Sequence, residues 1–252
     1  MQRFTGRRAL VTGASRGIGR GCAVALAREG ADVAVHGRDA AAVSATAELV
    51  RTQGRQALQL LADLTDEDAV DRLRADLEAA WGAPDVVVAC AGGSSVRPGP
   101  VQDITPEQWR REVDDNLTSV FLTLRAVLPG MERRGSGVVV TVSSTAARLP
   151  DPRSPAAYAA AKAGVEHLTA LAAAQAGPSG VRVCCVSPET VMSERNQQQI
   201  PPDVQEQLAA EHPLRRLGTV EDVAAAVAYL ASDDAGWVSG TTLTVAGGAV
   251  RV

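Results

Sequence analysis

The sequence predicts an α/β fold, with one doubly wound parallel sheet of about seven strands and helices on both faces. Strand and helix signals alternate along all 252 residues, and strict alternation of this kind produces a parallel sheet with right-handed crossovers. The run Val86–Cys90 is almost wholly apolar, as expected of a strand buried on both faces. Because no repeat, linker or low-complexity segment interrupts the alternation, we expect a single domain over 1–252.

The first half of the chain sets up this alternation with short apolar strands and helices rich in small residues. Thr65 and Asp68 resemble a capping box, so the third helix is expected to begin at 65. The expected order is strand 8–11, helix 17–28, strand 32–35, helix 40–53, strand 57–61, helix 65–81 and strand 86–90.

The second half continues the alternation with longer helices. The expected order is helix 105–115, helix 118–134, strand 138–142, helix 156–176, strand 181–186, helical segment 202–211, helix 219–231 and strand 242–245.

Composition and charge exclude several classes of protein. The net charge of −4 and a pI near 5.5 argue against a nucleic-acid partner, because phosphate binding needs a basic face. No apolar run reaches the roughly 18 residues of a membrane span, and the first residues do not fit a secretory signal. We therefore expect a cytoplasmic protein with neither nucleic acid nor membrane as a partner.

The cysteines predict no disulfide or metal site. None of the four has C-x-x-C or metal-ligand spacing, so we interpret them as reduced thiols of the core in a reducing compartment. Two of them are neighbours in a predicted strand, where successive side chains point to opposite faces. They are Cys22, Cys90, Cys184 and Cys185.

A glycine-rich turn follows the first strand. Its glycines, Gly13, Gly17 and Gly19, have the spacing G-x-x-x-G-x-G rather than the commoner G-x-G-x-x-G. Gly13 allows the sharp strand-to-helix turn, while Gly17 and Gly19 let a pyrophosphate approach the helix N-terminus. A tight turn that binds nothing is the alternative. Three glycines opening the first helix favour a dinucleotide site in a Rossmann-type domain.

The end of the second strand indicates which nicotinamide cofactor the turn would hold. An acid there binds the ribose 2′-hydroxyl and repels a 2′-phosphate, but Val35–Gly37 contains no acid and Arg38 follows it. Arg16 adds a cation within the turn, and arginine binds phosphate through parallel hydrogen bonds. We therefore predict a preference for NADP(H), with NAD(H) as the alternative. Asp39 is expected to cap the next helix, and Asp63 to contact an adenine amino group or cap a helix.

Tyr158 and Lys162 lie four residues apart in the predicted helix 156–176, so they share one helix face. An ammonium close to a phenol favours the phenolate and lowers the pKa of Tyr158, which suits proton exchange near neutral pH. Alone this pattern is weak, because many helices carry it on their surface. Together with the upstream glycine turn it predicts a catalytic pair.

Taken together, these residues resemble the short-chain dehydrogenase/reductase superfamily over the whole chain, and most closely its 3-oxoacyl-acyl-carrier-protein reductases. The resemblance implies an oxidoreductase that interconverts a small-molecule ketone and a secondary alcohol by hydride transfer. The motifs that carry it are the turn 12–19, Asp63, Asp115–Leu117, Ser143–Ser144, Tyr158 with Lys162, and the tail 237–240.

The resemblance also implies a role for each catalytic residue. Tyr158 is the acid/base, Lys162 lowers its pKa and binds the nicotinamide ribose, and Ser144 hydrogen-bonds the substrate carbonyl. Asn116 holds a water that connects Lys162 to solvent. Ser143 stays an alternative to Ser144; the structural alternatives are turn capping by Ser144 and a backbone contact by Asn116.

By the same resemblance, a wider set of residues contacts the cofactor, from the glycine turn to the segment after the sixth strand. These residues are Gly13, Ser15, Arg16, Gly17, Ile18, Gly19, Arg38, Asp63, Leu64, Cys90, Ala91, Gly92, Tyr158, Lys162, Pro188, Glu189, Val191 and Ser193.

Three positions depart from the superfamily pattern. Cys90 replaces the usual Asn after the fourth strand and cannot copy an amide. Glu189 replaces the usual Gly after Pro188 and places a carboxylate near the nicotinamide or the pocket mouth. Ala246 replaces the usual Asp of the terminal motif. None removes a catalytic group, so together they predict divergence in pocket and packing.

Several functions remain open beside a specialised ketoreductase or dehydrogenase. Arg133 and Arg134 could dock an acidic acyl carrier protein, but no cation stands near Pro178–Gly180. A 3-oxoacyl-acyl-carrier-protein reductase is therefore an alternative. Dehydratases, epimerases and isomerases of the superfamily usually lose or rearrange the tetrad, and a non-catalytic nucleotide-binding regulator would not need it. The intact tetrad argues against the dehydratases, epimerases and isomerases and against the non-catalytic regulator.

Substrate choice is expected to depend on 93–104, 145–156 and 189–213, which are loops by composition, with 189–213 forming a mobile lid. Helix 156–176 has more small apolar residues than one core-facing stripe needs, so a second covered face is expected beside helix 118–134. The apolar stretch 241–252 would add another contact. Two twofold interfaces predict a homotetramer, with a dimer as the alternative.

Overall fold

The computed structural model describes residues 2–249. Its strands are β1 (Arg8–Thr12), β2 (Asp32–Gly37), β3 (Ala57–Leu61), β4 (Val86–Ala89), β5 (Gly137–Val142), β6 (Val181–Pro188) and β7 (Thr242–Val245). They form one sheet with the order β3-β2-β1-β4-β5-β6-β7, and each neighbouring pair is parallel. The predicted parallel sheet of about seven strands is confirmed.

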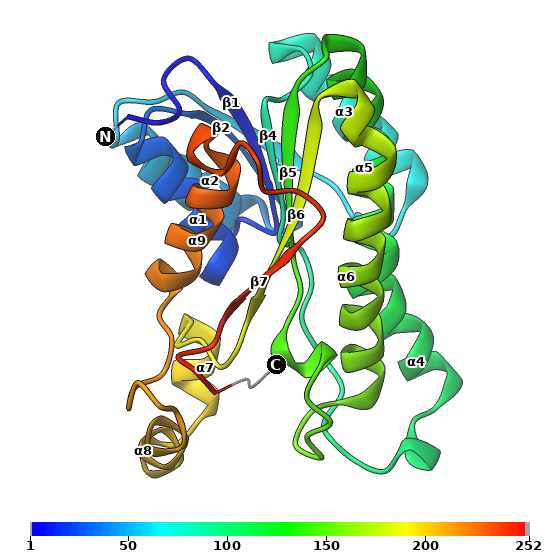
Figure 1. The fold of residues 1–252 in the computed structure, drawn as a ribbon, viewed down its shortest axis with the longest axis vertical. Coiled ribbons are helices and arrows are strands. Elements are labelled where there is room, and N and C mark those ends of the chain that lie inside the picture. The colour runs from blue at the N-terminus through cyan, green and yellow to red at the C-terminus, as the bar shows by residue number, and fades with distance from the viewer. Residues whose placement is uncertain (1, 250–252) are drawn as a thin grey trace.

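Helices cover both faces of this sheet (Figure 1). They are α1 (Gly17–Arg28), α2 (Ala40–Arg51), α3 (Glu67–Trp81), α4 (Pro106–Val113), α5 (Ser119–Arg134), α6 (Ala156–Ala176), α7 (Glu194–Gln199), α8 (Pro202–Glu211) and α9 (Val220–Ala231). One face carries α1, α2 and α9, and the other carries α3, α5 and α6. Helices α7 and α8 lie near the end of the sheet where β6 finishes, at the bottom of Figure 1.

The core is two apolar layers, one on each side of the sheet. Because strand side chains alternate between faces, Val88 joins one layer and Val87 the other. Cys184 and Cys185 divide in the same way, as their adjacency predicted. Valine, leucine and alanine make up most of both layers.

The start of α3 differs from the sequence prediction. Asp66, not Thr65, is the N-cap: its carboxylate accepts hydrogen bonds from the backbone N–H of Asp68 at 3.0 Å and of Ala69 at 3.4 Å. The Thr65 hydroxyl donates instead to Asp63 at 2.8 Å. The predicted capping box is therefore wrong, because Asp63 engages the threonine first. The predicted cap at Asp39 is confirmed, since its carboxylate accepts from Ala42 N at 3.1 Å.

The segment 189–213 contains two helices where its composition indicated a loop with one helical stretch. Helix α8 covers the predicted 202–211, but α7 was not expected. The α7 sequence, Glu-Arg-Asn-Gln-Gln-Gln, has no apolar period to reveal it. Its start is fixed by Ser193, whose hydroxyl accepts from Asn196 N at 3.4 Å.

Other sequence expectations concern membranes, metals and thiols. Within residues 2–249, no helix combines the length and apolar character needed to cross a membrane. In the same residues, no three His, Cys, Asp or Glu side chains gather as a metal site would require. The four cysteines are free thiols.

Candidate active site

The candidate site lies where β1 and β4 end. These two strands are neighbours in the sheet, and the chain leaves them toward opposite faces, so a crevice at their carboxyl ends is the usual ligand position in such folds. The glycine turn follows β1, and the segment 90–93 follows β4. The residues predicted to be functional come to this edge from both halves of the chain.

The glycine turn packs directly against the end of β4. Gly13 has φ +64°, and a Cβ placed on it would lie 2.7 Å from the Cα of Ala91. The Thr12 hydroxyl accepts hydrogen bonds from the backbone N–H of Cys90 at 3.1 Å and of Ala91 at 3.3 Å. A Cβ on Gly19 would lie 2.7 Å from the Gly13 carbonyl carbon and closer still to its oxygen. The turn therefore requires glycine at both positions.

His36, which belongs to no motif, supports this turn from β2. Its ring is buried, its Nδ1 accepts from Gly13 N at 3.4 Å, and its Nε2 lies 3.1 Å from the carbonyl oxygen of Ala62. Burial lowers the pKa of His36 to about 4. The imidazole is therefore neutral, with the Nε2 proton directed at Ala62.

Cys90 is held by a hydrogen bond from its backbone and has no amide side chain to add others. Its N–H bonds to Thr12, and burial raises the pKa of its thiol to about 11. The side chain is thus a neutral thiol near Lys162, whose charge acts on it. The contacts that secure this position between β4 and Gly92 are therefore those of its backbone.

Asn116 lies on a π-helical turn, Asp114–Thr118, between α4 and α5. Such turns widen a helix locally and are frequent at functional sites. The buried amide accepts from Gly93 N at 2.8 Å and donates to Gly93 O at 3.2 Å and Glu112 O at 3.0 Å. Asn116 therefore fixes the glycine segment after β4, so its structural role is present whatever else it does.

Lys162 is buried on α6, with 4% of its surface exposed. Its Nζ donates to the carbonyl oxygen of Val142 at 2.9 Å, and burial lowers its pKa. A Cβ on Gly92 would lie 3.3 Å from this Nζ and 2.7 Å from the Asn116 oxygen. Lys162 and Asn116 thus meet at Gly92.

The two serines after β5 have different partners. The Ser143 hydroxyl is buried and donates to the Lys162 carbonyl at 3.0 Å, so it anchors α6 to the sheet. Ser144 caps the short turn Thr145–Ala147, accepting from Ala146 N at 3.3 Å. Its hydroxyl also acts on the Tyr158 phenol, where it favours the charged form and so lowers the pKa. Only Ser144 is positioned to share a substrate oxygen with Tyr158.

The pKa of Tyr158 shifts in the direction opposite to the one predicted. Burial raises the pKa of the phenol, although the hydrogen bond with Ser144 and the charge of Arg195 act in the opposite direction. The Lys162 ammonium lies 5.6 Å from the centre of the Tyr158 ring. The prediction of a lowered pKa is therefore wrong for the chain by itself, because desolvation outweighs a cation that faces the ring.

The two predicted phosphate ligands are exposed arginines near the ends of β1 and β2. Arg16 and Arg38 both have solvent-exposed side chains. Arg38 Nη1 is 3.9 Å from a carboxylate oxygen of Asp63, whose other oxygen holds Thr65 N at 3.0 Å. Leu64 is 5% exposed and packs in the core, so only its backbone can face a ligand.

Glu189 is engaged by the C-terminal end of α8. One of its carboxylate oxygens lies 2.6 Å from Nε2 of His212, and Thr190 donates to the same carboxylate from its N–H and its hydroxyl. His212 Nδ1 lies 2.7 Å from the Leu208 carbonyl. Burial opposes the charged imidazole, but these two acceptors outweigh it and raise the pKa of His212. The carboxylate therefore joins the start of the lid segment, directly after β6, to its end, a pairing with no sequence signal.

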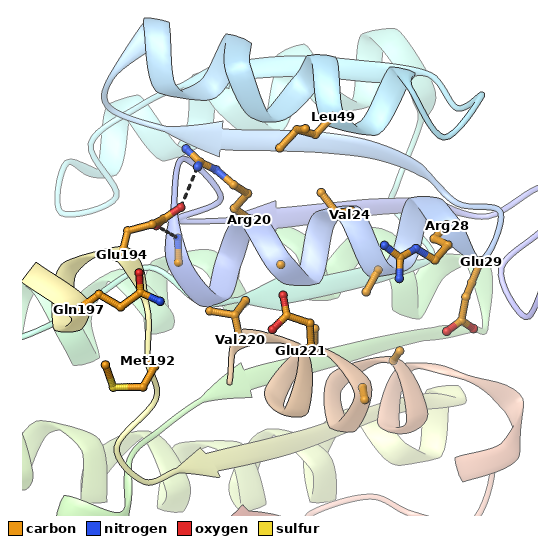
Figure 2. Close-up of a pocket in the computed structure, with 16 residues that line it drawn as sticks. Arg20, Val24, Arg28, Glu29, Leu49, Met192, Glu194, Gln197, Val220 and Glu221 are labelled. Carbon is orange, nitrogen blue, oxygen red and sulfur yellow. Dashed lines mark hydrogen bonds and ion pairs between the residues drawn. The ribbon is translucent and has the colours of Figure 1, made fainter. Parts of the chain in front are cut away.

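The predicted lid, residues 189–213, also contacts the glycine turn, as Figure 2 shows. Glu194 accepts from Gly17 N at 3.0 Å and from Arg20 Nη1 at 2.8 Å. A Cβ on Gly17 would lie 3.6 Å from Ser193. The first turn of α7 is thus seated on the N-terminus of α1, where a carboxylate is favoured by the helix dipole.

A groove of about 550 Å³ runs from this contact along α1 and α9 (Figure 2). Met192, Val220 and Glu221 help to line it, but the tetrad does not. The candidate site is therefore defined by the tetrad and the glycine turn, not by this groove.

Glu112 is a further residue that sequence reasoning missed. It is fully buried on α4, and its Oε1 accepts from Ser95 N at 2.8 Å and Val96 N at 3.2 Å. Its Oε2 has no hydrogen-bond partner among the described residues. Its position four residues before Asn116 is the only signal, because the i, i+4 bond to Asn116 places both on one helix face.

Comparison with known proteins agrees with this geometry. Residues 13–250 match the family model described as enoyl-(acyl carrier protein) reductase. The chain is 39% identical over 252 residues to cis-4-hydroxycyclohexanecarboxylate dehydrogenase of Sinomonas cyclohexanicum, covering 99% of this chain and 98% of the relative. It is 35% identical to 3-oxoacyl-[acyl-carrier-protein] reductase FabG of Staphylococcus aureus, covering 95% and 96%.

Solved structures agree with the same fold. The structure of a 7 alpha-hydroxysteroid dehydrogenase complexed with NADH and 7-oxo glycochenodeoxycholic acid superimposes with a TM-score of 0.93. It is 33% identical and covers 100% of this chain and 97% of that one.

Proposed function

Because the chain belongs to the short-chain dehydrogenase/reductase superfamily, it is a nicotinamide-dependent oxidoreductase of alcohols and ketones, and we propose that it prefers NADP(H) and uses Tyr158 as its acid/base. The observation that carries the proposal is the buried Lys162 ammonium 5.6 Å from the centre of the Tyr158 ring, at the edge where the glycine turn ends. By analogy with the relatives, the substrate is a small ketone or secondary alcohol.

The residues at this edge fit a dinucleotide. Gly13 and Gly19 give the turn a shape that no side chain would allow, and the N-terminus of α1 favours phosphate. Arg16 and Arg38 are exposed cations suited to a 2′-phosphate. The glycine turn with Asp63 and Leu64 would hold the adenosine half. Cys90–Gly92, Pro188, Glu189, Val191 and Ser193, with Tyr158 and Lys162, would hold the nicotinamide half.

The chain's own residues supply binding and proton transfer. When bound, the reduced nicotinamide supplies the hydride that forms the new C–H bond. The Tyr158 hydroxyl gives its proton to the former carbonyl oxygen, and Ser144 holds that oxygen by a second hydrogen bond. Lys162, kept in place by Val142 O, stabilises the phenolate that remains, and Asn116 holds the Gly92–Gly93 segment beside it.

The raised pKa of Tyr158 sets the pH dependence of the two directions. The neutral phenol is the form that donates a proton, so ketone reduction proceeds at all pH values below this pKa. Alcohol oxidation needs the phenolate, so its rate rises as the pH approaches the same pKa.

Cofactor choice is tested by Arg38. We expect the wild-type protein to bind NADPH at least tenfold more tightly than NADH, and Arg38→Gln to lose about tenfold in NADPH affinity with NADH affinity little changed. Titration of the reduced cofactors by fluorescence measures both constants. A wild-type preference for NADH would contradict the NADP(H) proposal. Gly37→Asp would be a poor test, because its Cβ would lie 2.8 Å from Val43.

A reductase of acyl-carrier-protein substrates is less well supported. Of the two arginines expected to dock an acidic carrier, Arg134 is engaged: it donates to Ala83 O at 2.6 Å and Pro84 O at 2.8 Å and lies 3.6 Å from Asp85. Only Arg133 is then left for docking.

We also propose that the chain forms a homotetramer, with a dimer as the alternative. Helix α6 buries one face and leaves a second face of small apolar side chains exposed, and α5 exposes Phe121 at 48%. The exposed apolar residues of α6 are Ala160, Ala163, Ala170, Leu171 and Ala174, and His167 and Gln175 are exposed beside them. The second predicted contact, 241–252, extends beyond the described residues. Light scattering measures the mass, and a monomer near 26.1 kDa would contradict both assemblies.

A further inference from the structure

We propose that Arg195 binds a carboxylate of the substrate, so that the preferred substrates are ketones and secondary alcohols that carry an acid group away from the reacting carbon. This inference rests on the proposed function and names the substrate class of the same site. Its basis is a guanidinium with neutral partners that the lid segment holds over the tetrad.

Arg195 donates hydrogen bonds to two residues near the site. It is the second residue of α7, and its Nη2 donates to the carbonyl oxygen of Ser94 at 2.7 Å while its Nε donates to Gln199 at 3.2 Å. Its Nη1 lies 3.5 Å from where a Cβ on Gly93 would stand. Within residues 2–249 both hydrogen-bond partners are uncharged. The guanidinium therefore keeps its full charge and has N–H groups to donate.

The guanidinium lies beside the reacting groups. Gly93, below its Nη1, is the residue that Asn116 holds by two hydrogen bonds. The charge of Arg195 also reaches Tyr158, where it favours the phenolate and opposes the effect of burial on the pKa. A substrate whose oxygen lies between Ser144 and Tyr158 thus has a cation on its lid side.

The acids around Arg195 are engaged elsewhere. Its neighbour Glu194 pairs with Arg20 at 2.8 Å and with Gly17 N. Glu112 is buried beneath the loop and holds Ser95 N and Val96 N through Oε1. Lys162, the cation of the tetrad, is 4% exposed and donates to Val142 O. Arg195, by contrast, is exposed, and the described residues give it no carboxylate partner.

A purely structural role makes a different prediction. If Arg195 served only to attach α7 to the Ser94 carbonyl, its loss would affect charged and neutral substrates alike. If it binds a carboxylate, its loss would affect acids alone. The ratio of kcat/KM for an acid to kcat/KM for its methyl ester separates the two roles.

The test uses 4-oxocyclohexanecarboxylate and its methyl ester as matched ketones, with NADPH or NADH as reductant. We expect the wild-type protein to favour the acid, and Arg195→Met to lower the acid-to-ester ratio roughly 10- to 100-fold, mainly through KM of the acid. The matched control is Arg72→Met, an exposed arginine on α3, which should keep the wild-type ratio. Arg195→Lys retains the charge without the fork and should restore part of the ratio.

Each outcome decides one proposal. Equal loss for acid and ester in Arg195→Met, or a wild-type preference for the ester, would overturn the role of Arg195 and leave the proposed function standing. Absence of turnover with both ketones and with a wider panel of ketones, in a wild-type protein that binds cofactor, would overturn the proposed function instead. Thermal melting of each variant checks its fold, and if Arg195→Met fails to fold, the ratio in Arg195→Lys decides between the two roles.

Discussion

Two regions meet at the candidate site, and they are attached to the protein in opposite ways. In the catalytic region, Asn116, Ser143 and Lys162 are buried, and their side chains bond to backbone groups of neighbouring elements. In the lid segment 189–213, charged side chains add to the backbone contacts that Thr190 and Met192 make with Gly218. Glu194 reaches Arg20 and Gly17 N, and Glu189 reaches His212 within the segment.

This difference predicts which of the two regions tolerates amino-acid substitutions. A buried donor that loses its backbone acceptor leaves an unsatisfied polar group, which costs about 1–3 kcal/mol. The catalytic region is therefore intolerant of change. Exposed ion pairs contribute roughly 0–1 kcal/mol each. Substitutions in the lid, including those that change substrate preference, should therefore cost little stability. Four predictions test this contrast, beginning with the catalytic region.

The largest effect is expected for Tyr158→Phe. The change removes the hydroxyl and keeps the ring, so turnover should fall at least about 100-fold while cofactor binding persists. Initial rates and cofactor titration measure the two properties. Tyr229→Phe is the matched control, because that ring is 40% exposed on α9 and should keep wild-type turnover. Near-wild-type turnover in Tyr158→Phe would reject the acid/base role.

Gly19→Ala should be the next most damaging. The new Cβ would stand 2.7 Å from the Gly13 carbonyl carbon, and neither backbone can move without opening the turn. We expect a loss of about 1–3 kcal/mol in the free energy of unfolding, as for other overpacked sites, and at least tenfold weaker cofactor binding. Chemical denaturation and cofactor titration measure these effects.

Gly177→Ala is the control for that turn. A Cβ on Gly177 meets nothing within 4 Å, so both quantities should stay near wild type. If the two alanine variants behaved alike, the turn would not need the shape we describe.

The Glu189–His212 pair joins the two ends of the lid segment, so it predicts a stability that depends on pH. The folded pKa of His212 is raised above its ordinary value of 6.5. Its stabilising contribution is therefore fully present below about pH 6.5 and is lost as the pH rises through the folded pKa. Between about pH 6 and pH 9, we expect the wild-type free energy of unfolding to lose on the order of 1 kcal/mol more than that of His212→Gln.

Denaturant melts at both pH values check this difference, and His167→Gln, an exposed histidine on α6, serves as the control. The control should follow the wild-type pH dependence. If His212→Gln kept the full wild-type pH dependence, the dependence would have to come from another titrating group.

The smallest effect is expected for Glu194→Gln. Its carboxylate occupies the N-terminus of α1, where we place the cofactor phosphates, so removing the charge should tighten cofactor binding about two- to fivefold with little change in stability. Glu221→Gln, on the same groove (Figure 2), should leave the affinity unchanged. Weaker binding in Glu194→Gln would mean that the carboxylate supports the turn instead of competing for it.

The same contrast explains how much could be predicted from sequence. The strands and the shared helix face of Tyr158 and Lys162 could be predicted because apolar runs and fixed spacings report local backbone geometry, whereas Asn116 was identified through the resemblance to the superfamily. The Glu194–Gly17 contact joins residues 177 positions apart, and nothing local marks it. Helix α7 escaped prediction for a related reason, since a short polar helix held by an ion pair has no apolar period.

Two local predictions failed because a nearby partner or burial took precedence. Thr65 looked like an N-cap but is engaged by Asp63, and Asp66 caps α3 in its place. The pKa of Tyr158 was predicted to be lowered by Lys162, but the sequence does not reveal how fully the phenol is desolvated. Burial then decides the direction.

The central claim is that this chain delivers a hydride to a carbonyl carbon while Tyr158 supplies the proton. Incubation with NADPH deuterated at the transferable position and 4-oxocyclohexanecarboxylate, followed by NMR of the product, tests it most directly. We predict an alcohol with one deuterium on the former carbonyl carbon, formed by the wild-type protein and nearly absent with Tyr158→Phe. A product without deuterium at that carbon, or equal product from the two proteins, would contradict the account.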